Sequence, residues 1–347
     1  MISQKSFGIT PNGGVKITQY ILQNSNGVSA TLINYGATLT SLKVPDKNKK
    51  FTEITLGFDT VDEYVEHEFY FGATIGRVAN RIINARFTYQ DISYELSRNY
   101  KEIHHLHGGI RSFDKRIWTA TPIEEENAVG VKFFYLSKNG EEGYPGNLAV
   151  IVTYMLDDNN ELKITYFAKA DQPTPVDLTN HTYWNLAGAG NGDVLNHVLH
   201  VPADEYIVTA ENHLPTGEIK AVNHSAVDFR IAMRIGERIE QVGGYDLCYV
   251  IKPTNHHLHR LPLAASITEP TTNRKLNVYT TQPGLQFYTG NYLYPYKIAG
   301  NKKIDKYGGF CFETQNFPAA VNHNNFPSPF LLPDQIYHHE TIYKIIL

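Results

Sequence analysis

The stretch from Val129 to Ala168 most constrains the fold, because it contains three runs rich in β-branched and aromatic residues. The runs are VGVKFFYLS, LAVIVTYML and LKITYFA, and the last two are separated by the polar segment DDNNE. Two such runs joined by a short polar segment predict a β-hairpin, and the spacing typical of an amphipathic helix is absent. We therefore expect antiparallel β-structure to dominate the chain.

Similar patterns occur on both sides of this stretch. Residues 28–44 alternate around Gly36, which predicts strands that meet at a bend, and residues 276–293 alternate around a Gln282-Pro283-Gly284 turn. The ending ETIYKIIL predicts a last strand. Two short helices are expected, in VDEYVEH (61–67) and in RIGERIEQV (234–242), where the isoleucines recur at helical intervals.

The 347 residues carry no internal repeat, low-complexity tract or shift in composition that would mark a linker. Large all-β architectures can fill this length as one unit. We expect a single all-β domain over residues 1–347, with a large core supplied by the 42% of hydrophobic residues.

Charge, hydropathy and cysteine usage argue against binding of nucleic acid, insertion into a membrane and a thiolate zinc site. The 31 Lys and Arg are balanced by 35 Asp and Glu, and no dense basic run is present, so nucleic acid is not expected to bind. No apolar run approaches the length of a membrane span, and the N-terminus lacks a signal-peptide core. Cys248 and Cys311 form no CxxC pair, which predicts neither a disulfide framework nor a thiolate zinc site and fits the reducing cytoplasm.

The segment LTNHTYWNLAGAG (178–190) holds one histidine, His181, between Asn180 and Asn185 and beside two aromatic residues. Aromatic faces, amides and an imidazole suit a sugar. The same histidine can equally be a packing residue, and this segment alone leaves both interpretations open.

Two further segments carry charged or imidazole side chains in apolar surroundings. Arg77 and Arg81 flank Asn80, and a buried arginine needs a partner, so a structural ion pair and a binding site are both possible. The segment EIHHLHGG (102–109) allows two interpretations. His105 and His107 are either two metal ligands on one strand face, or only one imidazole of the segment faces a sugar. The histidine-rich segment TNHHLHRLP (254–262) is expected to be a solvated loop.

Two carboxylates stand out. Glu313 lies in GGFCFETQNFP between phenylalanines, where a glutamate is unusual unless it is paired or functional, and Asp246 precedes the apolar run LCYVI. Neither a phosphate-binding glycine fingerprint nor a GxSxG motif is present. Histidines and carboxylates on a β scaffold suit proton transfer on a neutral sugar, in which a base takes the C1 hydroxyl proton while an acid protonates the ring oxygen.

Eleven runs, in chain order, resemble the galactose mutarotase (aldose 1-epimerase) family along almost the whole chain. They are TLINYGATLTSLKVPD, LGFDT, FGATIGRVANRI, HLHGG, EEGYPGNL, PTPVDLTNHTYWNLAG, LPTGEI, VDFR, TTQPGLQFYTGN, GFCFETQNFPAAVNH and NFPS. The resemblance implies a large antiparallel β-sandwich without cofactor or metal, which interconverts the anomers of a free aldose such as galactose or glucose, as a monomer or weak homodimer.

The resemblance also implies roles for individual residues. Glu313 would be the general base and His181 the general acid. The sugar would be held by Asn80, Arg81, His107, Asp246 and Gln282. Family members commonly have a histidine after the aspartate, where this chain has Leu247.

Burial would raise the pKa of Glu313, whereas Arg81 or a protonated His181 would lower it. We expect an ionised Glu313 and a His181 able to donate at neutral pH. Other possible classes are a metal-dependent sugar isomerase using His105, His107, His181 and Glu313, a glycosidase using Asp246 and Glu313, a non-catalytic sugar-binding sandwich, and a hexose-6-phosphate epimerase. The last would need an extra basic cluster, which the sequence lacks.

Overall fold

The computed structural model describes residues 1–11, 13–210, 212–252 and 261–347. In these residues the strand ladders are antiparallel, and α1 (Val61–Glu66) is the only α-helix. The all-β prediction is therefore confirmed. Most of the histidine-rich segment 254–262, expected to be a loop, lies outside the described residues.

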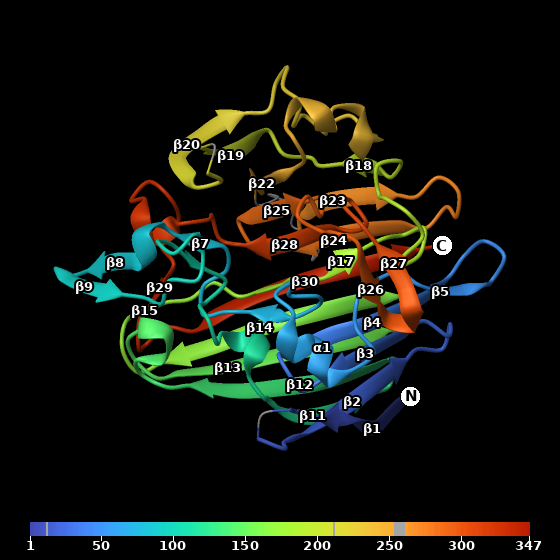
Figure 1. Ribbon diagram of the computed structural model, residues 1–347, viewed down its shortest axis with the longest axis horizontal. Helices are drawn as coiled ribbons and strands as arrows, with labels where there is room; N and C mark the ends of the chain where they lie inside the picture. The colour runs from blue at the N-terminus through green and yellow to red at the C-terminus, as the bar shows by residue number, and fades with distance from the viewer. Residues whose placement is uncertain (12, 211, 253–260) are drawn as a thin grey trace.

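Among the described residues the strands form three large sheets (Figure 1). The N-terminal sheet contains β1 (Ile2–Ile9), β2 (Lys16–Gln23), β3 (Ser29–Ile33), β4 (Thr38–Pro45) and β5 (Phe51–Glu53). The long-strand sheet has the order β11 (Thr119–Glu125), β12 (Ala128–Ser137), β13 (Leu148–Asp157), β14 (Glu161–Ala170), β30 (Tyr337–Ile346), β24 (Lys275–Thr280), β23 (Leu263–Thr268), β18 (Val198–His200), β21 (Met233–Arg234). The site sheet has the order β17 (Tyr183–Trp184), β28 (Phe310–Gln315), β25 (Gly284–Tyr288), β22 (Asp246–Val250), β19 (Glu205–Thr209), β20 (Pro215–Ala221).

Short strand pairs and turns connect these sheets. The pairs are β6 (Thr74–Ile75) with β16 (Thr179–Asn180), β7 (Arg81–Ile82) with β10 (His105–Leu106), β8 (Arg86–Tyr89) with β9 (Ile92–Glu95), β15 (Thr174–Pro175) with β29 (Phe330–Leu331), and β26 (Tyr296–Ile298) with β27 (Lys302–Ile304). The 3₁₀ turns are η1 (Ile83–Ala85), η2 (Phe113–Lys115), η3 (Glu141–Gly143), η4 (Ile235–Glu237), η5 (Ile239–Gln241), η6 (Ala299–Asn301) and η7 (Ala320–Asn322).

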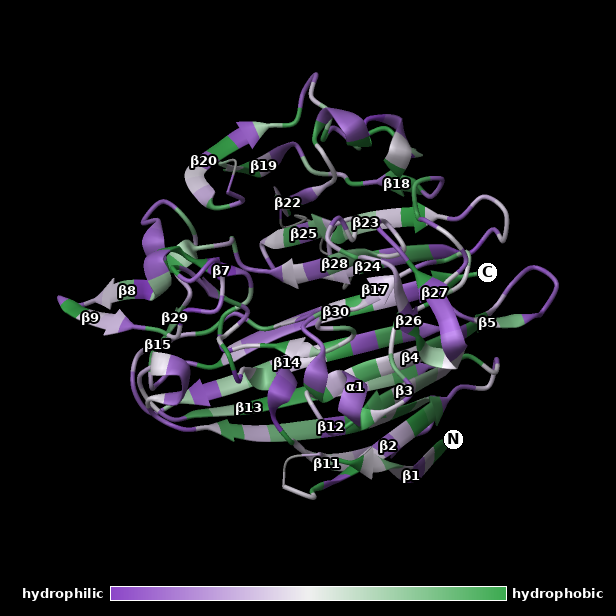
Figure 2. Ribbon diagram, in the orientation of Figure 1, coloured by the Kyte–Doolittle hydropathy of each residue, from purple (hydrophilic) through white to green (hydrophobic). Residues whose placement is uncertain are grey.

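The predicted hairpin is the pair β13 and β14, whose ladder runs from Leu148 opposite Ala170 to Leu156 opposite Leu162. Along β14, buried and half-buried residues alternate, because successive side chains of a strand point to opposite faces. The long strands accordingly show green and paler residues in alternation in Figure 2. Burial of this apolar face is what makes the strands pair in this register.

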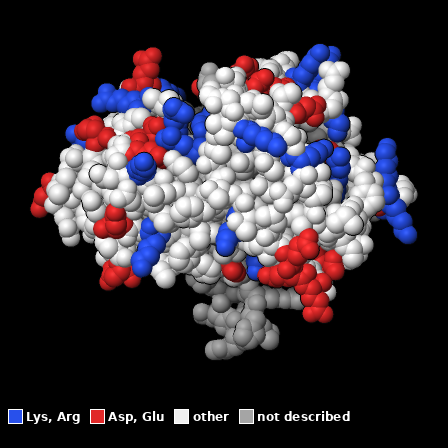
Figure 3. Space-filling view, turned by 90° about the horizontal axis from the view of Figure 1, so that it is seen from below, with Lys and Arg blue, Asp and Glu red and all other residues white. Residues whose placement is uncertain are grey.

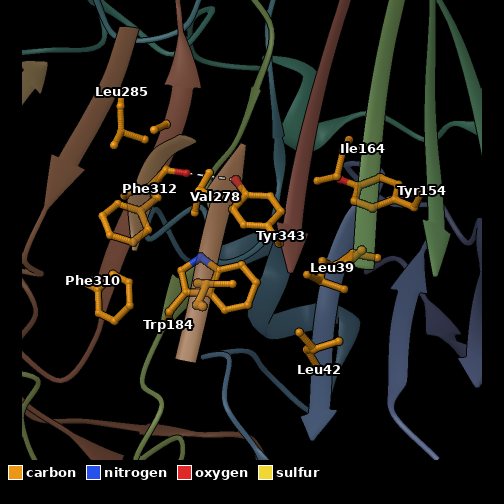
Figure 4. Packing of buried hydrophobic residues seen from close by; sticks show 14 of the residues in the cluster. Leu39, Leu42, Tyr154, Ile164, Trp184, Val278, Leu285, Phe310, Phe312 and Tyr343 are labelled. Atoms are coloured by element: carbon orange, nitrogen blue, oxygen red, sulfur yellow. Dashed lines mark hydrogen bonds between the residues drawn. The ribbon is translucent and has the colours of Figure 1, made fainter. Parts of the chain in front are cut away.

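The core lies between the sheets, as expected for a β-sandwich. Tyr20 of β2 meets Phe133 of β12 edge to face, with ring centroids 6.1 Å apart. Farther along the same face of the long-strand sheet, Trp184 packs against Tyr343 of β30 at 5.1 Å, and the Tyr343 hydroxyl donates to the Phe312 carbonyl at 3.0 Å (Figure 4). The long-strand sheet is thus covered by both other sheets, and the predicted antiparallel β-sandwich is confirmed.

Strand β28 has two functionally different faces. Phe312 belongs to the main hydrophobic core, and the Thr314 hydroxyl bonds the Thr341 hydroxyl of β30 at 2.6 Å. Cys311 and Glu313 alternate with these residues and point the other way, toward His181. The apolar neighbours of Glu313 in the sequence therefore belong mostly to the opposite face of its strand.

The two helix predictions had different outcomes. VDEYVEH forms α1, which begins with a capping box made by Thr60 and Glu63. RIGERIEQV does not form a helix but the two turns η4 and η5, because Arg238 between them leaves the helical region and no side chain caps either turn. A segment this short is marginal without caps, although Ile235 and Ile239 are buried, as their spacing predicted.

The strands predicted around Gln282-Pro283-Gly284 are present as β24 and β25, but they lie in different sheets. The turn passes the chain from the long-strand sheet to the site sheet. Across the described residues, no helix has the length and apolar character needed to cross a bilayer. On the face in Figure 3, basic and acidic residues are interspersed among wide uncharged areas.

Candidate active site

A cleft of about 540 Å³ opens beside the site sheet. Several chain segments that are distant in sequence converge on it. Its described lining residues are Glu66, His67, Glu68, Phe69, Tyr70, Asn80, Arg81, Tyr100, Leu106, His107, His181, Tyr183, Asp246, Tyr288, Tyr292, Leu293, Tyr294 and Glu313. Six of the seven site residues expected from the sequence are in this list.

His181 lies between β16 and β17, and its backbone is fixed on both sides. Its N–H donates to the Ala73 carbonyl at 2.9 Å, and its carbonyl accepts from Gly72 N–H at 3.0 Å. The imidazole is stacked between the rings of Tyr70, at 5.6 Å, and Tyr183, at 5.1 Å. This stack holds the plane of the ring, so that its edge faces the cleft.

Glu313 approaches the edge of that ring from β28. Its Oε1 atom is 3.7 Å from His181 Nε2, and both side chains are almost completely buried. Its other oxygen, Oε2, has no hydrogen-bond partner among the described residues. A buried carboxylate oxygen without a partner in the protein is a candidate for contact with a ligand.

The protonation of this pair differs from our expectation. Burial, together with the negative charge of Asp246, raises the pKa of Glu313 to about 8, although Arg81 lowers it. Burial also lowers the pKa of His181 to about 4. Desolvation therefore exceeds the effect of Arg81, and at neutral pH the pair holds one proton, on Glu313 rather than on His181.

Asp246 is held by two hydrogen bonds, and His213 Nδ1 lies 3.9 Å from its Oδ2 atom. Arg81 Nη2 donates to Oδ2 at 3.0 Å, and Gln286 Nε2 donates to Oδ1 at 2.6 Å. Arg81 Nε, however, is buried and has no partner in the described part of the protein. Arg81 thus forms one of the ion pairs that its sequence context allowed, and it also lines the cleft.

Arg77 forms no such pair in the described structure, which corrects the ion-pair interpretation for this residue. Its guanidinium donates to neutral acceptors of neighbouring loops, including Ser137 Oγ at 2.8 Å and the carbonyls of Pro145 and Gly146 at 2.8 and 2.9 Å. Burial lowers its pKa to about 10, so that it stays charged at neutral pH. Its role is to fix these loops.

Asn80 and His107 hold each other at the cleft wall. The Asn80 N–H donates to His107 Nδ1 at 3.1 Å, and the His107 N–H donates to the Asn80 carbonyl at 3.0 Å. Both residues have positive φ, and at Gly108 a Cβ atom would collide with the Gly76 carbonyl. The glycine is therefore required for the close approach of the two loops.

His105 is not part of the site. Its Nδ1 lies 2.7 Å from the Ser97 carbonyl, and its Nε2 lies 2.7 Å from the Tyr144 hydroxyl. Strand β10 ends at Leu106, and His107 turns the chain with φ 51°, so the two histidines do not share a strand face. Of the two interpretations of HLHGG, the structure supports a single imidazole that faces the cleft.

Gln282 was expected to bind the sugar, and this expectation is wrong. Its Nε2 donates to the Tyr337 hydroxyl at 2.8 Å, and it lines a different cavity of about 290 Å³. Gln286, four residues later, is paired in register with Glu313 and bonds Asp246. The alternation of β25 is the sequence signal that could have identified it, because Gln286 is the polar residue of the apolar run GLQFY.

Replacing Gln286 by Leu is expected to raise KM about tenfold or more, because the charged Asp246 loses the hydrogen bond that Gln286 donates to it. The substitution also removes the Gln286 Oε1 atom, which is buried and has no partner among the described residues. Gln282→Leu is the matched control. It should lower the melting temperature through the lost Tyr337 bond and leave KM unchanged. Steady-state kinetics that gave equal KM changes for the two variants would contradict this assignment.

Leu247, where the chain departs from the family pattern, faces away from the cleft. It belongs to the main hydrophobic core, whereas Asp246 before it lines the cleft. The departure therefore affects the packing behind Asp246 and leaves the surface that faces the ligand unchanged.

His107, His181 and Glu313 offer ligand atoms that all lie within 4.8 Å of one another. The hydrogen bond from Asn80 N–H occupies the lone pair of His107 Nδ1. In a neutral imidazole the proton is then on Nε2, which becomes a donor toward the cleft. This arrangement suits a hydroxyl group better than a metal ion.

The chain is similar to known proteins over almost its whole length. The model of the aldose 1-epimerase family matches residues 18–344. Galactose mutarotase from Rattus norvegicus is 40% identical, over 99% of this chain and 98% of that protein, and aldose 1-epimerase from Escherichia coli is 36% identical, over 94% of both chains. The crystal structure of an aldose epimerase homologue from C. elegans superposes with a TM-score of 0.87 and 31% identity, and covers 94% of this chain and 98% of that one.

Proposed function

The chain belongs to the aldose 1-epimerase family, and from this membership we propose that Glu313 and His181 are the acid–base pair through which it acts. The protein is an isomerase that interconverts the α and β anomers of aldoses in sugar metabolism. Galactose, named by several relatives, and glucose are the substrates that we propose. The observation that carries the assignment is the 3.7 Å contact between His181 Nε2 and Glu313 Oε1 in the cleft.

The two groups are sufficient for the reaction. In ring opening, the Glu313 carboxylate takes the proton of the C1 hydroxyl, the bond between C1 and the ring oxygen breaks, and His181 gives a proton to that oxygen. The product is an open-chain aldehyde with a protonated Glu313 and a neutral His181. Rotation about C1–C2 followed by the reverse proton transfers gives the other anomer, and nothing is consumed.

A proton on Glu313 and a neutral His181 are also the charge state that the pair has after ring opening. Moving that proton to His181 gives the state that begins ring opening, with the same total charge. Arg81 supports this second state, because it lowers the pKa of Glu313. Both states need one proton shared by the pair, whichever residue carries it.

A bell-shaped pH dependence of kcat/KM is therefore expected, with limits near pH 4 and pH 8 from the pKa values of His181 and Glu313. Below the lower limit both groups are protonated and no base remains for the C1 hydroxyl. Above the upper limit neither group has a proton for the ring oxygen. Polarimetric rates measured from pH 3 to about pH 9 check this, and a flat profile would contradict the pair.

The charges of the cleft favour a neutral sugar. The described residues that line it include the carboxylates of Glu66, Glu68 and Asp246, and Arg81 is their only lysine or arginine. A sugar phosphate would meet excess negative charge there, which disfavours a hexose-6-phosphate substrate. A glycosidase is disfavoured because both oxygens of Asp246 already accept hydrogen bonds from Arg81 and Gln286.

Prolonged treatment with a chelator is expected to leave the mutarotation rate unchanged, since the proposed steps use only protons. The His107 tautomer set by Asn80 is the structural reason. The measurement compares rates before and after dialysis against EDTA, and then after addition of Zn²⁺ or Mn²⁺. Loss of activity that either metal restores would instead favour a metal-dependent isomerase.

The function is tested directly by polarimetry with fresh α-D-galactose and α-D-glucose. The protein should accelerate the change in optical rotation over that in buffer alone. A protein that binds galactose without changing this rate would be a non-catalytic sugar-binding sandwich, and the proposal would be wrong.

We also propose that residues 1–347 form one domain, which acts as a monomer or weak homodimer in the cytoplasm. One hydrophobic core cluster includes residues of all three large sheets, which supports a single domain. All the proposed site residues come from one chain, so the site needs no partner subunit. Two buried cysteines without a disulfide suit a reducing compartment.

A further inference from the structure

Strand β28 presents two side chains to His181. Glu313 lies near Nε2, and Cys311, two residues earlier on the same strand face, has its Sγ atom 3.6 Å from Nδ1. Each nitrogen of the imidazole is thus met by a different residue of one strand. Glu313 has a role in the proposed reaction, whereas the thiol has none so far.

The geometry points to Cys311 as a positioning residue: its sulfur accepts a hydrogen bond from His181 Nδ1–H and so keeps the Nε2 atom as the nitrogen that gives and takes the proton. This inference rests on the proposed acid–base pair. After His181 gives its Nε2 proton, the neutral ring must keep the Nδ1 proton, because the lone pair on Nε2 receives the proton again when the sugar ring closes.

Among the described side chains, the Cys311 sulfur is the one within hydrogen-bond distance of Nδ1, and a hydrogen bond with the backbone at His181 also supports a proton on the ring. The stacked rings of Tyr70 and Tyr183 fix the plane of the imidazole but offer it no hydrogen bond in that plane. Cys311 is fully buried, and Tyr183 is its partner in the ladder between β17 and β28, so the backbone that carries the thiol is fixed beside the backbone of Tyr183.

The thiol also stays chemically inert. Burial and the charges of Glu313 and Asp246 raise the pKa of Cys311 well above its usual value, so it carries no negative charge. A thiolate or carboxylate at this place would stabilise the imidazolium and hold the proton on His181. A neutral sulfur is a weak acceptor that directs the Nδ1 proton without trapping the second one.

The test is the tautomer of His181, observed by ¹⁵N–¹H correlation spectra of the ¹⁵N-histidine-labelled protein near neutral pH. The signal is assigned as the one that His181→Asn removes. In the wild type we expect the proton on Nδ1 and an unprotonated Nε2. Cys311→Ala should move the proton to Nε2 and lower kcat by about tenfold, the value of one modest hydrogen bond, with KM unchanged.

Cys311→Ser restores an acceptor and should recover the wild-type tautomer and most of kcat. Cys248→Ala is the matched control, because Cys248 is also buried on the site sheet but its thiol faces the Tyr249 carbonyl rather than a histidine. Cys248→Ala should change neither the tautomer of His181 nor kcat.

A wild-type ring with its proton on Nε2, or a Cys311→Ala protein with unchanged tautomer and kcat, would overturn the inference. The tautomer readout needs no turnover, so it is independent of whether the pair is catalytic. Failure of the pair itself would appear instead as normal activity in variants of Glu313 and His181.

Discussion

Replacing Glu313 by Gln is expected to lower kcat for mutarotation by a factor on the order of 10² or more, because the reaction loses its base for the C1 hydroxyl. The amide has the shape of the carboxyl group and can still bond a sugar hydroxyl, so KM should stay near the wild-type value. Because burial raises the pKa of Glu313 to about 8, this group must take up a proton on folding at neutral pH, and the amide avoids that cost. Stability should therefore be maintained or improved, and polarimetry and thermal unfolding measure both effects.

Glu269→Gln is the control for this substitution. Glu269 is also buried, but its carboxylate accepts bonds from Thr271 and Thr272 outside the cleft. Its variant should lose stability and keep kcat. If Glu313→Gln retained full activity, the base would have to be another group and the mechanism proposed above would be rejected.

Replacing His181 by Ala is the second large effect, with an expected loss in kcat on the order of 10² or more, because the ring oxygen loses its acid. The substitution also leaves a flat space between the rings of Tyr70 and Tyr183. Free imidazole should enter this space and restore part of the activity, with a dependence on its concentration that saturates.

The rescue distinguishes proton transfer from packing. Imidazole should leave Glu313→Gln as slow as before, since that variant lacks the base and has no empty space beside the tyrosines. A His181→Ala protein that stayed folded but was nearly as active as the wild type would show that His181 is a packing residue, the alternative that its sequence context left open.

The sequence predicted the β-strands well, because strand formation depends on local patterns such as alternating apolar residues and runs of β-branched residues. Residues 148–170 form the expected hairpin, and Glu313 was identified because a carboxylate in an apolar strand is unusual. The segment 234–242 shows the limit of such patterns. Its isoleucines are buried as predicted, but spacing alone could not reveal that a break at Arg238 would divide the helix.

The parts that could not be predicted depend on contacts between distant segments. Arg81 meets Asp246 across 165 positions, and no local pattern joins them. Choosing between Gln282 and Gln286 required knowing that the chain changes sheets at that turn. The protonation of Glu313 and His181 depends on how completely each is removed from water, which sequence composition does not determine.

The two faces of β28 have a consequence for engineering. The strand carries Cys311 and Glu313 toward the cleft, while Phe312 and Thr314 are fastened to β30 behind it. A substitution that repacks the interior beneath this strand is therefore expected to shift the carboxylate as well, because both faces share one backbone. Substitutions intended to raise the melting temperature should therefore leave the residues between β28 and β30 unchanged. They are better placed at the outer edges of the sandwich, away from the reacting atoms.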